Sequence, residues 1–159
     1  MGRAYKETII KGTFATGKVT GITDVGGLVG KGSAIKIKNT YATGPVTGNT
    51  NVAGLVGSSV GSAVGSAYLI EIDNTYAAGK VTGVNNVGGL IGWGELTKIT
   101  ASLWDTETTG QSQGVGTTQN ATENQDATGK TSAELREQQT YAGWDFDNTW
   151  FMLDGQTRP

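Results

Sequence analysis

The chain has 159 residues, of which 36% are hydrophobic and 26 are glycine, and its net charge is −2. Low net charge with abundant Val, Ile and Thr argues against disorder and indicates one thin-cored, strand-rich domain. Cysteine and histidine are absent, which excludes disulfides, ordinary zinc sites and Ser-His-Asp or Cys-His catalysis, and no stretch approaches the roughly 20 apolar residues that span a membrane.

One segment occurs three times, at residues 14–30, 41–57 and 76–92. Each copy reads aromatic-Ala-x-Gly, then Val-Thr-Gly, then Val-x-Gly-Leu-Val/Ile-Gly. A repeat of this size indicates a solenoid. Three short strands per copy predict an all-β, three-sided parallel β-solenoid of about four coils, right-handed like nearly all parallel crossovers. The repeated glycines are expected to supply positive φ angles at the corners.

Segments 35–38 and 70–73, ahead of the second and third copies, alternate isoleucine with a charged residue, which places isoleucine on one face and charge on the other. Stacking the copies in register then sets opposite charges side by side, pairing Lys36 with Glu71 and Lys38 with Asp73.

Aligned copies give columns of like residues, spaced about 4.8 Å apart in a parallel stack. The apolar columns contain Val19, Val46 and Val81; Val25, Val52 and Val87; and Leu28, Leu55 and Leu90. The aromatic column contains Phe14, Tyr41 and Tyr76, and is expected to continue to Trp104. Two polar columns contain Thr13, Thr40 and Thr75, and Asp24, Asn51 and Asn86.

Residues 1–105 are expected to form the solenoid, with a partial fourth copy at residues 102–105. Small and polar residues at 58–67 lengthen the second interval and predict a corner loop. Residues 106–130 are rich in Thr, Gln, Gly and Asn and predict a long polar loop.

Residues 131–159 are expected to cap the C-terminal end of the solenoid, where unpaired strand edges would otherwise be exposed. Thr131 and Glu134 form a capping box that predicts a short helix over residues 132–139. Residues 144–153 predict an aromatic hairpin. The predicted cap residues are Trp104, Leu135, Trp144, Phe146 and Trp150. The first coil shows no comparable cap, so we expect either preceding solenoid sequence or another molecule's end to cover it.

The repeat resembles the GLUG motif, whose Gly-Leu-hydrophobic-Gly core stands here at residues 27–30, 54–57 and 89–92. The Tyr-Ala-Thr-Gly lead-in and the segments 103–110, 129–131 and 143–146 are similar to the same family. GLUG repeats occur in bacterial filamentous haemagglutinin-like adhesins and in the repeat regions of some immunoglobulin A peptidases. The resemblance implies a non-catalytic stalk or adhesive segment, secreted or at the cell surface, with a surface glycan or protein as partner.

Two alternatives remain open. Residues 1–99 carry a net charge of +4 and residues 100–159 one of −6, so copies could stack end to end through the first coil into filaments or oligomers. A polysaccharide-binding or polysaccharide-cleaving β-helix is the second alternative.

No cofactor is expected. Calcium is the one metal that the sequence suggests, through Asp105 with Glu107 and Asp145 with Asp147, but neither pair has the spacing of an EF-hand loop. The lysines are scattered without interleaved aromatic residues, which argues against nucleic acid.

Overall fold

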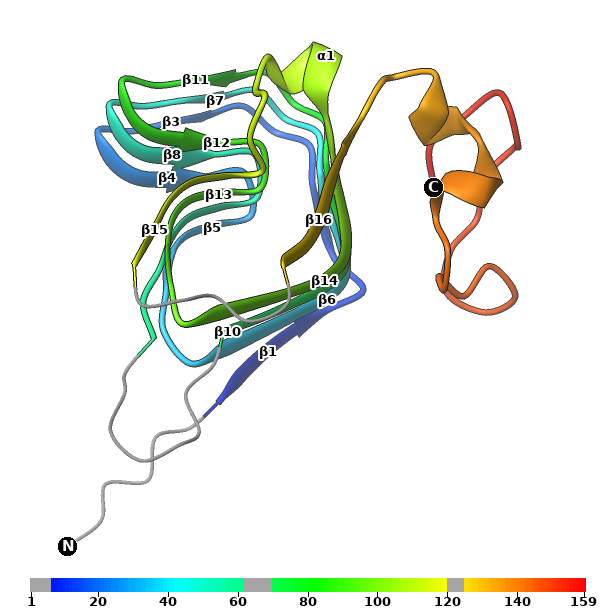
Figure 1. Cartoon of the computed structure of the whole chain (residues 1–159), viewed down its shortest axis with the longest axis horizontal. Helices are drawn as coiled ribbons and strands as arrows, with labels where there is room; N and C mark the ends of the chain where they lie inside the picture. The colour runs from blue at the N-terminus through cyan, green and yellow to red at the C-terminus, as the bar shows by residue number, and fades with distance from the viewer. Residues whose placement is uncertain (1–6, 62–69, 120–124) are drawn as a thin grey trace, which may run out of the picture.

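The computed structural model describes residues 7–61, 70–119 and 125–159. The chain winds into coils, and each strand pairs in parallel with the equivalent strand of the neighbouring coil (Figure 1). The parallel β-solenoid expected from the repeats is confirmed. Its strands form four sheets, which we call sheets A to D in the order in which a coil passes through them.

Sheet A contains the alternating segments and the aromatic column. Its strands are β1 (Thr8–Lys11), β2 (Phe14–Ala15), β6 (Ile35–Ala42), β10 (Ile70–Ala77), β14 (Thr97–Asp105) and β16 (Gln125–Lys130). Sheet B holds β3 (Val19–Thr20), β7 (Val46–Thr47) and β11 (Val81–Thr82); sheet C holds β4 (Thr23–Gly26), β8 (Thr50–Ala53) and β12 (Asn85–Gly88). Sheet D holds β5 (Val29–Gly32), β9 (Val56–Ser59), β13 (Ile91–Glu95) and β15 (Val115–Gln119).

Three coils pass through all four sheets, and β14 with β15 forms a fourth that skips sheets B and C. In place of two strands, the fourth coil has the single-turn helix α1 (Thr106–Thr109). β16 then adds a further strand to sheet A. The expected number of about four coils is therefore confirmed.

The expectation of a long polar loop over residues 106–130 is wrong. Residues 115–119 form β15 on β13, and residues 125–130 form β16 on β14. The polar composition misled the prediction because each of these strands is the last in its sheet among the described residues. An edge strand needs backbone partners on one side only, so it tolerates polar and small side chains.

Most of the expected corner loop at residues 58–67 lies outside the described residues, since only 58–61 are described. Ser58 and Ser59 belong to β9, and their side chains are buried.

The corner of sheet A is formed by a residue with a side chain in three coils and by Gly12, with a φ angle of 60°, in the first. Asn39, Asn74 and Ala101 have φ angles of 51°, 49° and 42° at equivalent places in three coils. Asparagine tolerates this left-handed conformation better than most residues with a side chain. Among the described residues, the glycines with positive φ lie outside the three copies, so the expectation that the repeated glycines supply these angles is wrong.

The repeated glycines instead allow backbones to touch. A Cβ atom on Gly44 would lie 2.0 Å from the carbonyl oxygen of Gly17 in the coil before, and one on Gly79 would lie 2.0 Å from that of Gly44. A Cβ on Gly57 would lie 2.4 Å from the amide nitrogen of Val25. Side chains at these positions would force neighbouring coils apart.

The solenoid interior holds two apolar clusters. The larger lies between sheets A and D and includes Ile37, Ile72 and Ile99, all completely buried. The smaller is a stack of valines between sheets B and C. Both clusters repeat the same residue type from coil to coil, which lets each side chain pack on its equivalent in the next coil.

The C-terminal segment after β16 contains two 3-10 helices, η1 (Glu134–Arg136) and η2 (Gln138–Thr140), in place of the expected continuous helix. The capping box is confirmed, because the Thr131 amide donates to Glu134 Oε2 at 2.8 Å and the Glu134 amide donates to Thr131 Oγ1 at 3.2 Å. The expected hairpin is wrong: residues 146–149 form a turn, but 144–145 and 150–153 are not strands. Among the described residues, no helix is long and apolar enough to cross a membrane.

Candidate functional site

The predicted apolar columns lie where the alignment placed them. Val46 pairs with Val19 and with Val81, and Val52 pairs with Val25 and with Val87. In the leucine column, the Leu28 amide donates to the Leu55 carbonyl at 3.0 Å, and the Leu55 amide donates to the Leu90 carbonyl at 3.2 Å. These columns hold the coils in register and offer no chemistry of their own.

The aromatic column forms a stack on the outside of sheet A. The rings of Phe14 and Tyr41 lie 5.2 Å apart and those of Tyr41 and Tyr76 5.0 Å apart, each pair within 8° of parallel. Exposure falls along the stack, from 63% at Phe14 to 2% at Tyr76. The stack is therefore open at the first coil and covered at the third.

Trp104 does not continue this stack. The register pairs Tyr76 with Leu103 and Ala77 with Trp104, so the tryptophan falls one residue out of the expected column and on the opposite face of the strand. Its side chain lies in the solenoid core, where its indole N–H donates to the Gln111 carbonyl at 2.9 Å. The expectation that Trp104 belongs to the cap is wrong.

The other predicted cap residues do come together. Leu135, Trp144 and Trp150 are buried in one cluster with Tyr76 and Leu103, and Phe146 packs at its margin. The rings of Trp144 and Trp150 lie 4.5 Å apart. Trp150 also contacts the aromatic stack, with its ring 6.3 Å from that of Tyr41.

The C-terminal segment covers the side of the solenoid and not its end. Figure 1 shows it beside the half of sheet A that follows the corner, away from the sheet edges. The cluster that it forms with Tyr76 and Leu103 lies on the outer face of that sheet. The expectation that this segment closes the C-terminal end is therefore wrong. Aromatic side chains on the outer face of sheet A bury more apolar surface than a strand edge could, and they determine where the segment packs.

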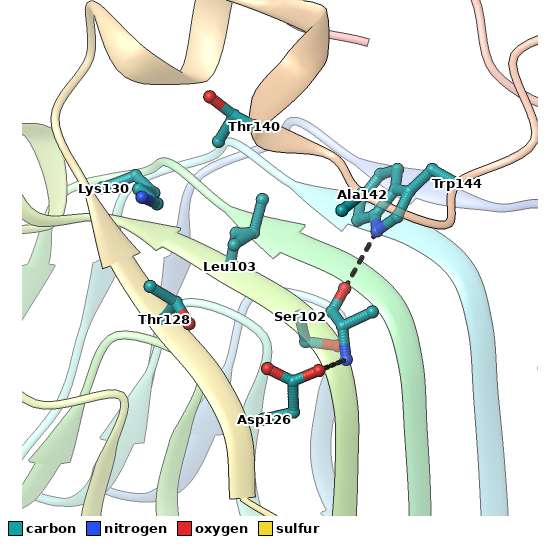
Figure 2. A pocket seen from close by; sticks show the side chains of 9 residues that line it. Ser102, Leu103, Asp126, Thr128, Lys130, Thr140, Ala142 and Trp144 are labelled. Atoms are coloured by element: carbon teal, nitrogen blue, oxygen red, sulfur yellow. Dashed lines mark hydrogen bonds between the residues drawn. The ribbon is translucent and has the colours of Figure 1, made fainter.

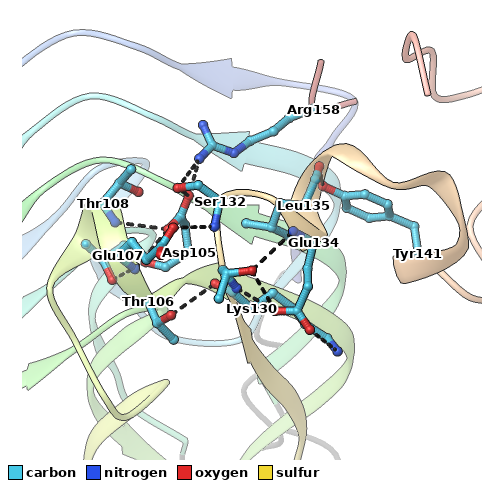
Figure 3. Close-up of polar contacts among 12 residues, drawn as sticks. Asp105, Thr106, Glu107, Thr108, Lys130, Ser132, Glu134, Leu135, Tyr141 and Arg158 are labelled. Atoms are coloured by element: carbon cyan, nitrogen blue, oxygen red, sulfur yellow. Dashed lines mark hydrogen bonds and ion pairs between the residues drawn. The ribbon is translucent and has the colours of Figure 1, made fainter. Parts of the chain in front are cut away.

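A buried polar cluster anchors this segment to the fourth coil (Figure 3). Asp105, completely buried, accepts hydrogen bonds from the Glu107 and Thr108 amides at 3.0 and 2.9 Å and so caps α1. Its second oxygen accepts from Ser132 Oγ at 2.6 Å and forms an ion pair with Arg158. One carboxylate thus joins a helix start and both ends of the C-terminal segment.

The titration of Asp105 follows from these contacts. Burial raises its pKa, but the hydrogen bonds from Ser132, Thr108 and Glu107 and the charge of Arg158 together lower the pKa by more than burial raises it. The pKa of Asp105 therefore lies below its ordinary value. In the capping box, hydrogen bonds from Thr131 lower the pKa of Glu134 in the same way. Both carboxylates are therefore held in the charged form as hydrogen-bond acceptors.

A small pocket of about 200 Å³ separates β14 and β16 from the C-terminal segment (Figure 2). At its edge the corner residue Ala101 donates its amide to Asp126 Oδ2 at 3.1 Å and accepts the Trp144 indole N–H at 3.0 Å. The register between β14 and β16 shifts here, and these two side chains replace the lost backbone partners. Lys130, another lining residue, is paired with Glu134 at 3.5 Å. Asp126, Trp144 and Lys130 thus use their polar groups for contacts within the fold.

The charged and amide columns are also confirmed. Lys36 lies 3.7 Å from Glu71, and Lys38 lies 3.4 Å from Asp73. In the turn column the Asn51 side-chain amide donates to Asp24 at 2.7 Å, and that of Asn86 donates to Asn51 at 2.7 Å.

The suggested calcium ligands are engaged elsewhere. Asp105 binds Arg158, Glu107 accepts from the Ser132 amide, and Asp145 accepts the Asp147 and Asn148 amides of its own turn. Within the part of the chain that the structure describes, no three residues of the types His, Cys, Asp or Glu are grouped so that they could hold a metal ion. The hydrogen bonds and the ion pair of these carboxylates instead stiffen the coils and their contacts.

Several important residues were not predicted from the sequence. Arg158 and Ser132 have no signal there, because their partner Asp105 is 53 and 27 residues away. Trp93, in β13, is a third such residue. Its place in sheet D could have been found by extending the aligned copies one residue further, which sets Trp93 opposite Ser58.

Comparison of the chain with protein-family models, with curated proteins and with solved structures gives no match.

Proposed function

We propose that this chain is a non-catalytic structural and adhesive β-solenoid segment of a bacterial secreted or cell-surface protein, acting as a rigid stalk or display scaffold. The observation that carries the proposal is the continuous register, in which every sheet repeats the same pairing from coil to coil. Such a stack transmits load through parallel backbone ladders and buried columns, and its length can grow by whole coils. The bacterial and surface setting is supported by the GLUG resemblance.

The inner side chains support a structural role over a catalytic one. Asp105, the one fully buried carboxylate of the described residues, is paired with Arg158 and accepts three further hydrogen bonds. A glycosidase needs two carboxyls at a fixed separation across a substrate cleft. Asp105 instead serves as an anchor between two parts of the fold.

Fractionation of the source cells with an antibody against this chain tests the proposal. We expect the antigen in the medium or on intact, protease-accessible cells. A reducing-sugar assay with a panel of polysaccharides accompanies it, and we expect no release above buffer. An antigen confined to the cytoplasm would contradict the surface role, and polysaccharide cleavage would contradict the structural one.

The exposed first coil favours end-to-end assembly as a second function. Ile9 on β1 and Phe14 on β2 are each 63% exposed. Among the described residues, β1 to β5 pair with a strand on one side only. An unpaired strand edge with exposed apolar side chains is a template for another chain. The partner of this coil would be the outer edge of β15 and β16 in a second copy.

Light scattering and electron microscopy at low and high salt test this assembly. We expect filaments or defined oligomers that dissociate when Ile9→Lys is introduced, since a charge on the edge blocks pairing. The matched control is Ile22→Lys, because Ile22 is also exposed, at 76%, but lies outside the strands. A strict monomer at every concentration would falsify assembly.

A further inference from the structure

Sheets C and D enclose an open groove on the outside of the solenoid. Figure 1 shows the chain reversing between these two sheets, so that they run back along each other. Glycine makes this close approach possible: a Cβ on Gly92 would lie 2.6 Å from the Asn51 carbonyl carbon. The groove has a volume of about 450 Å³ and is lined by Asp24, Lys31, Thr50, Asn51, Ser58, Val60, Asn86 and Trp93.

One wall of the groove is a ladder of polar side chains with two asparagines at its centre, called here the asparagine ladder. Asn51 donates to Asp24, Asn86 donates to Asn51, and Thr117 Oγ1 donates to Asn86, each at 2.7 Å. Each asparagine uses one amide N–H in the ladder and keeps a second for another partner. The second and third coils therefore each offer one free donor, about 4.8 Å apart.

The opposite wall is a row of outward-facing residues in sheet D. The strand register sets Lys31 beside Ser58, Ser58 beside Trp93, and Trp93 beside Thr117. Trp93 is half-buried, so part of its indole is open to the groove. The row thus combines one aromatic surface with two hydroxyl groups.

Two polar groups in this row have no partner. Ser58 is only 2% exposed, yet its hydroxyl makes no hydrogen bond with any residue that the structure describes. The indole N–H of Trp93 is likewise unpaired within the described ranges. Because Ser58 and Trp93 both line the open groove, these two groups are free to form hydrogen bonds with a ligand there.

The charge of the groove limits the ligand. Its two charged residues are Lys31 and Asp24, whose charged atoms lie 4.0 Å apart and offset each other. An anionic polymer would gain little here, since a strong phosphate or carboxylate site needs unopposed cationic groups. Amides, hydroxyls and one indole face suit a ligand with many hydroxyl groups and an apolar ring face.

We propose that this groove binds a neutral polysaccharide, with a sugar ring packed on Trp93 and its hydroxyl groups bonded to Ser58 and to the asparagine ladder. The sugar chain lies along the solenoid axis, because the polar groups repeat in that direction. The proposal names a ligand class for the adhesive part of the proposed function and rests on it. Surface location is measured separately by cell fractionation, so failure of sugar binding leaves the stalk role standing.

Isothermal titration calorimetry with the whole chain tests the proposal. The probes are hexasaccharides of β-1,4-linked glucose, xylose, mannose and N-acetylglucosamine, with hexagalacturonate as the anionic comparison. We expect at least one neutral hexasaccharide to bind and to change the tryptophan fluorescence. Trp93→Ala should weaken its binding about tenfold or more, and Ser58→Ala should weaken it severalfold, while Trp93→Phe should retain most of it.

The control variant is Ile22→Ala, which removes an exposed side chain outside the groove and should bind like the parent. Circular dichroism establishes that each variant keeps its strand content. The proposal is overturned if none of the neutral sugars binds, if Trp93→Ala binds as tightly as the parent, or if hexagalacturonate alone binds.

Discussion

The coils and the C-terminal segment are stabilised in different ways. In the coils, each residue type packs on its equivalent in the next coil, as in the valine and aromatic columns. The C-terminal segment, residues 131–159, has no repeat, and an aromatic cluster with one ion pair holds it to the outside of sheet A. Repetition therefore fixes the register of the coils, whereas single non-repeated contacts determine where the last segment lies.

The two regions should also respond differently to the loss of one buried side chain. Ile72 in the coils and Leu135 in the C-terminal segment are both completely buried, and truncating either to alanine should cost about 2–5 kcal/mol. Ile72→Ala should lower the stability of all coils, because its neighbours are columns that run through the stack. Leu135→Ala should release the C-terminal segment alone.

Hydrogen exchange distinguishes these outcomes amide by amide. The comparison between regions fails if Leu135→Ala speeds exchange in β6 and β10 as much as Ile72→Ala does.

The link between the regions is Asp105, and it should make stability depend on pH. Removing one partner of a buried ion pair is strongly destabilising, so Arg158→Ala should cost roughly 3 kcal/mol, the low end of that range because the Arg158 side chain is 24% exposed. The folded-state pKa of Asp105 is lowered, so its contribution is present above the ordinary carboxyl pKa of about 4 and is lost as the pH falls through the lower folded value.

Urea unfolding between pH 2 and pH 7 measures this effect. Asp105→Asn should flatten the acid limb of the stability curve. Glu107→Gln is the matched control, since Glu107 is exposed and makes its hydrogen bond to Ser132 without the ion pair. An unchanged acid limb in Asp105→Asn would show that other carboxylates cause the loss.

The role of glycine in the coils can be tested within one column. Gly17, Gly44 and Gly79 occupy equivalent positions, but only Gly44 and Gly79 pack against a preceding coil. Gly44→Ala and Gly79→Ala should each cost about 1–3 kcal/mol, as overpacking does. Gly17→Ala should be nearly neutral, because its added Cβ meets nothing within 4 Å. Equal effects at all three positions, measured as thermal midpoints, would contradict the close stacking of the coils.

The smallest effect is expected for the charged column. Lys36→Glu replaces an attraction to Glu71 by repulsion, but such part-exposed pairs contribute only about 0–1 kcal/mol each. The double variant Lys36→Glu with Glu71→Lys should recover only part of the loss, because Lys36 also forms an ion pair with Glu7 at 3.0 Å. A double-mutant cycle at low salt measures this, and a coupling energy of zero would mean that the column follows the register without contributing to it.

How much the sequence reveals differs between the same two regions. The apolar and charged columns could be predicted from the aligned copies alone, because in-register stacking makes equivalent positions of successive copies neighbours. The tryptophan at 104 could not, since one extra residue turns a side chain from the outer face to the core. The position of the C-terminal segment depends on Arg158 reaching Asp105 across 53 residues, a contact that no local pattern indicates.

Each coil lies in register on the one before it, and a pair of disulfide variants tests this register most directly. The chain has no cysteine, so Lys38→Cys with Asp73→Cys introduces the only two thiols. These residues are register partners, about 4.8 Å apart, which is within the range that a disulfide spans. We predict that this pair oxidises readily in the folded chain, whereas Lys38→Cys with Glu71→Cys, offset by two residues, does not. Oxidation of the offset pair alone would contradict the register and with it the in-register stacking of the coils.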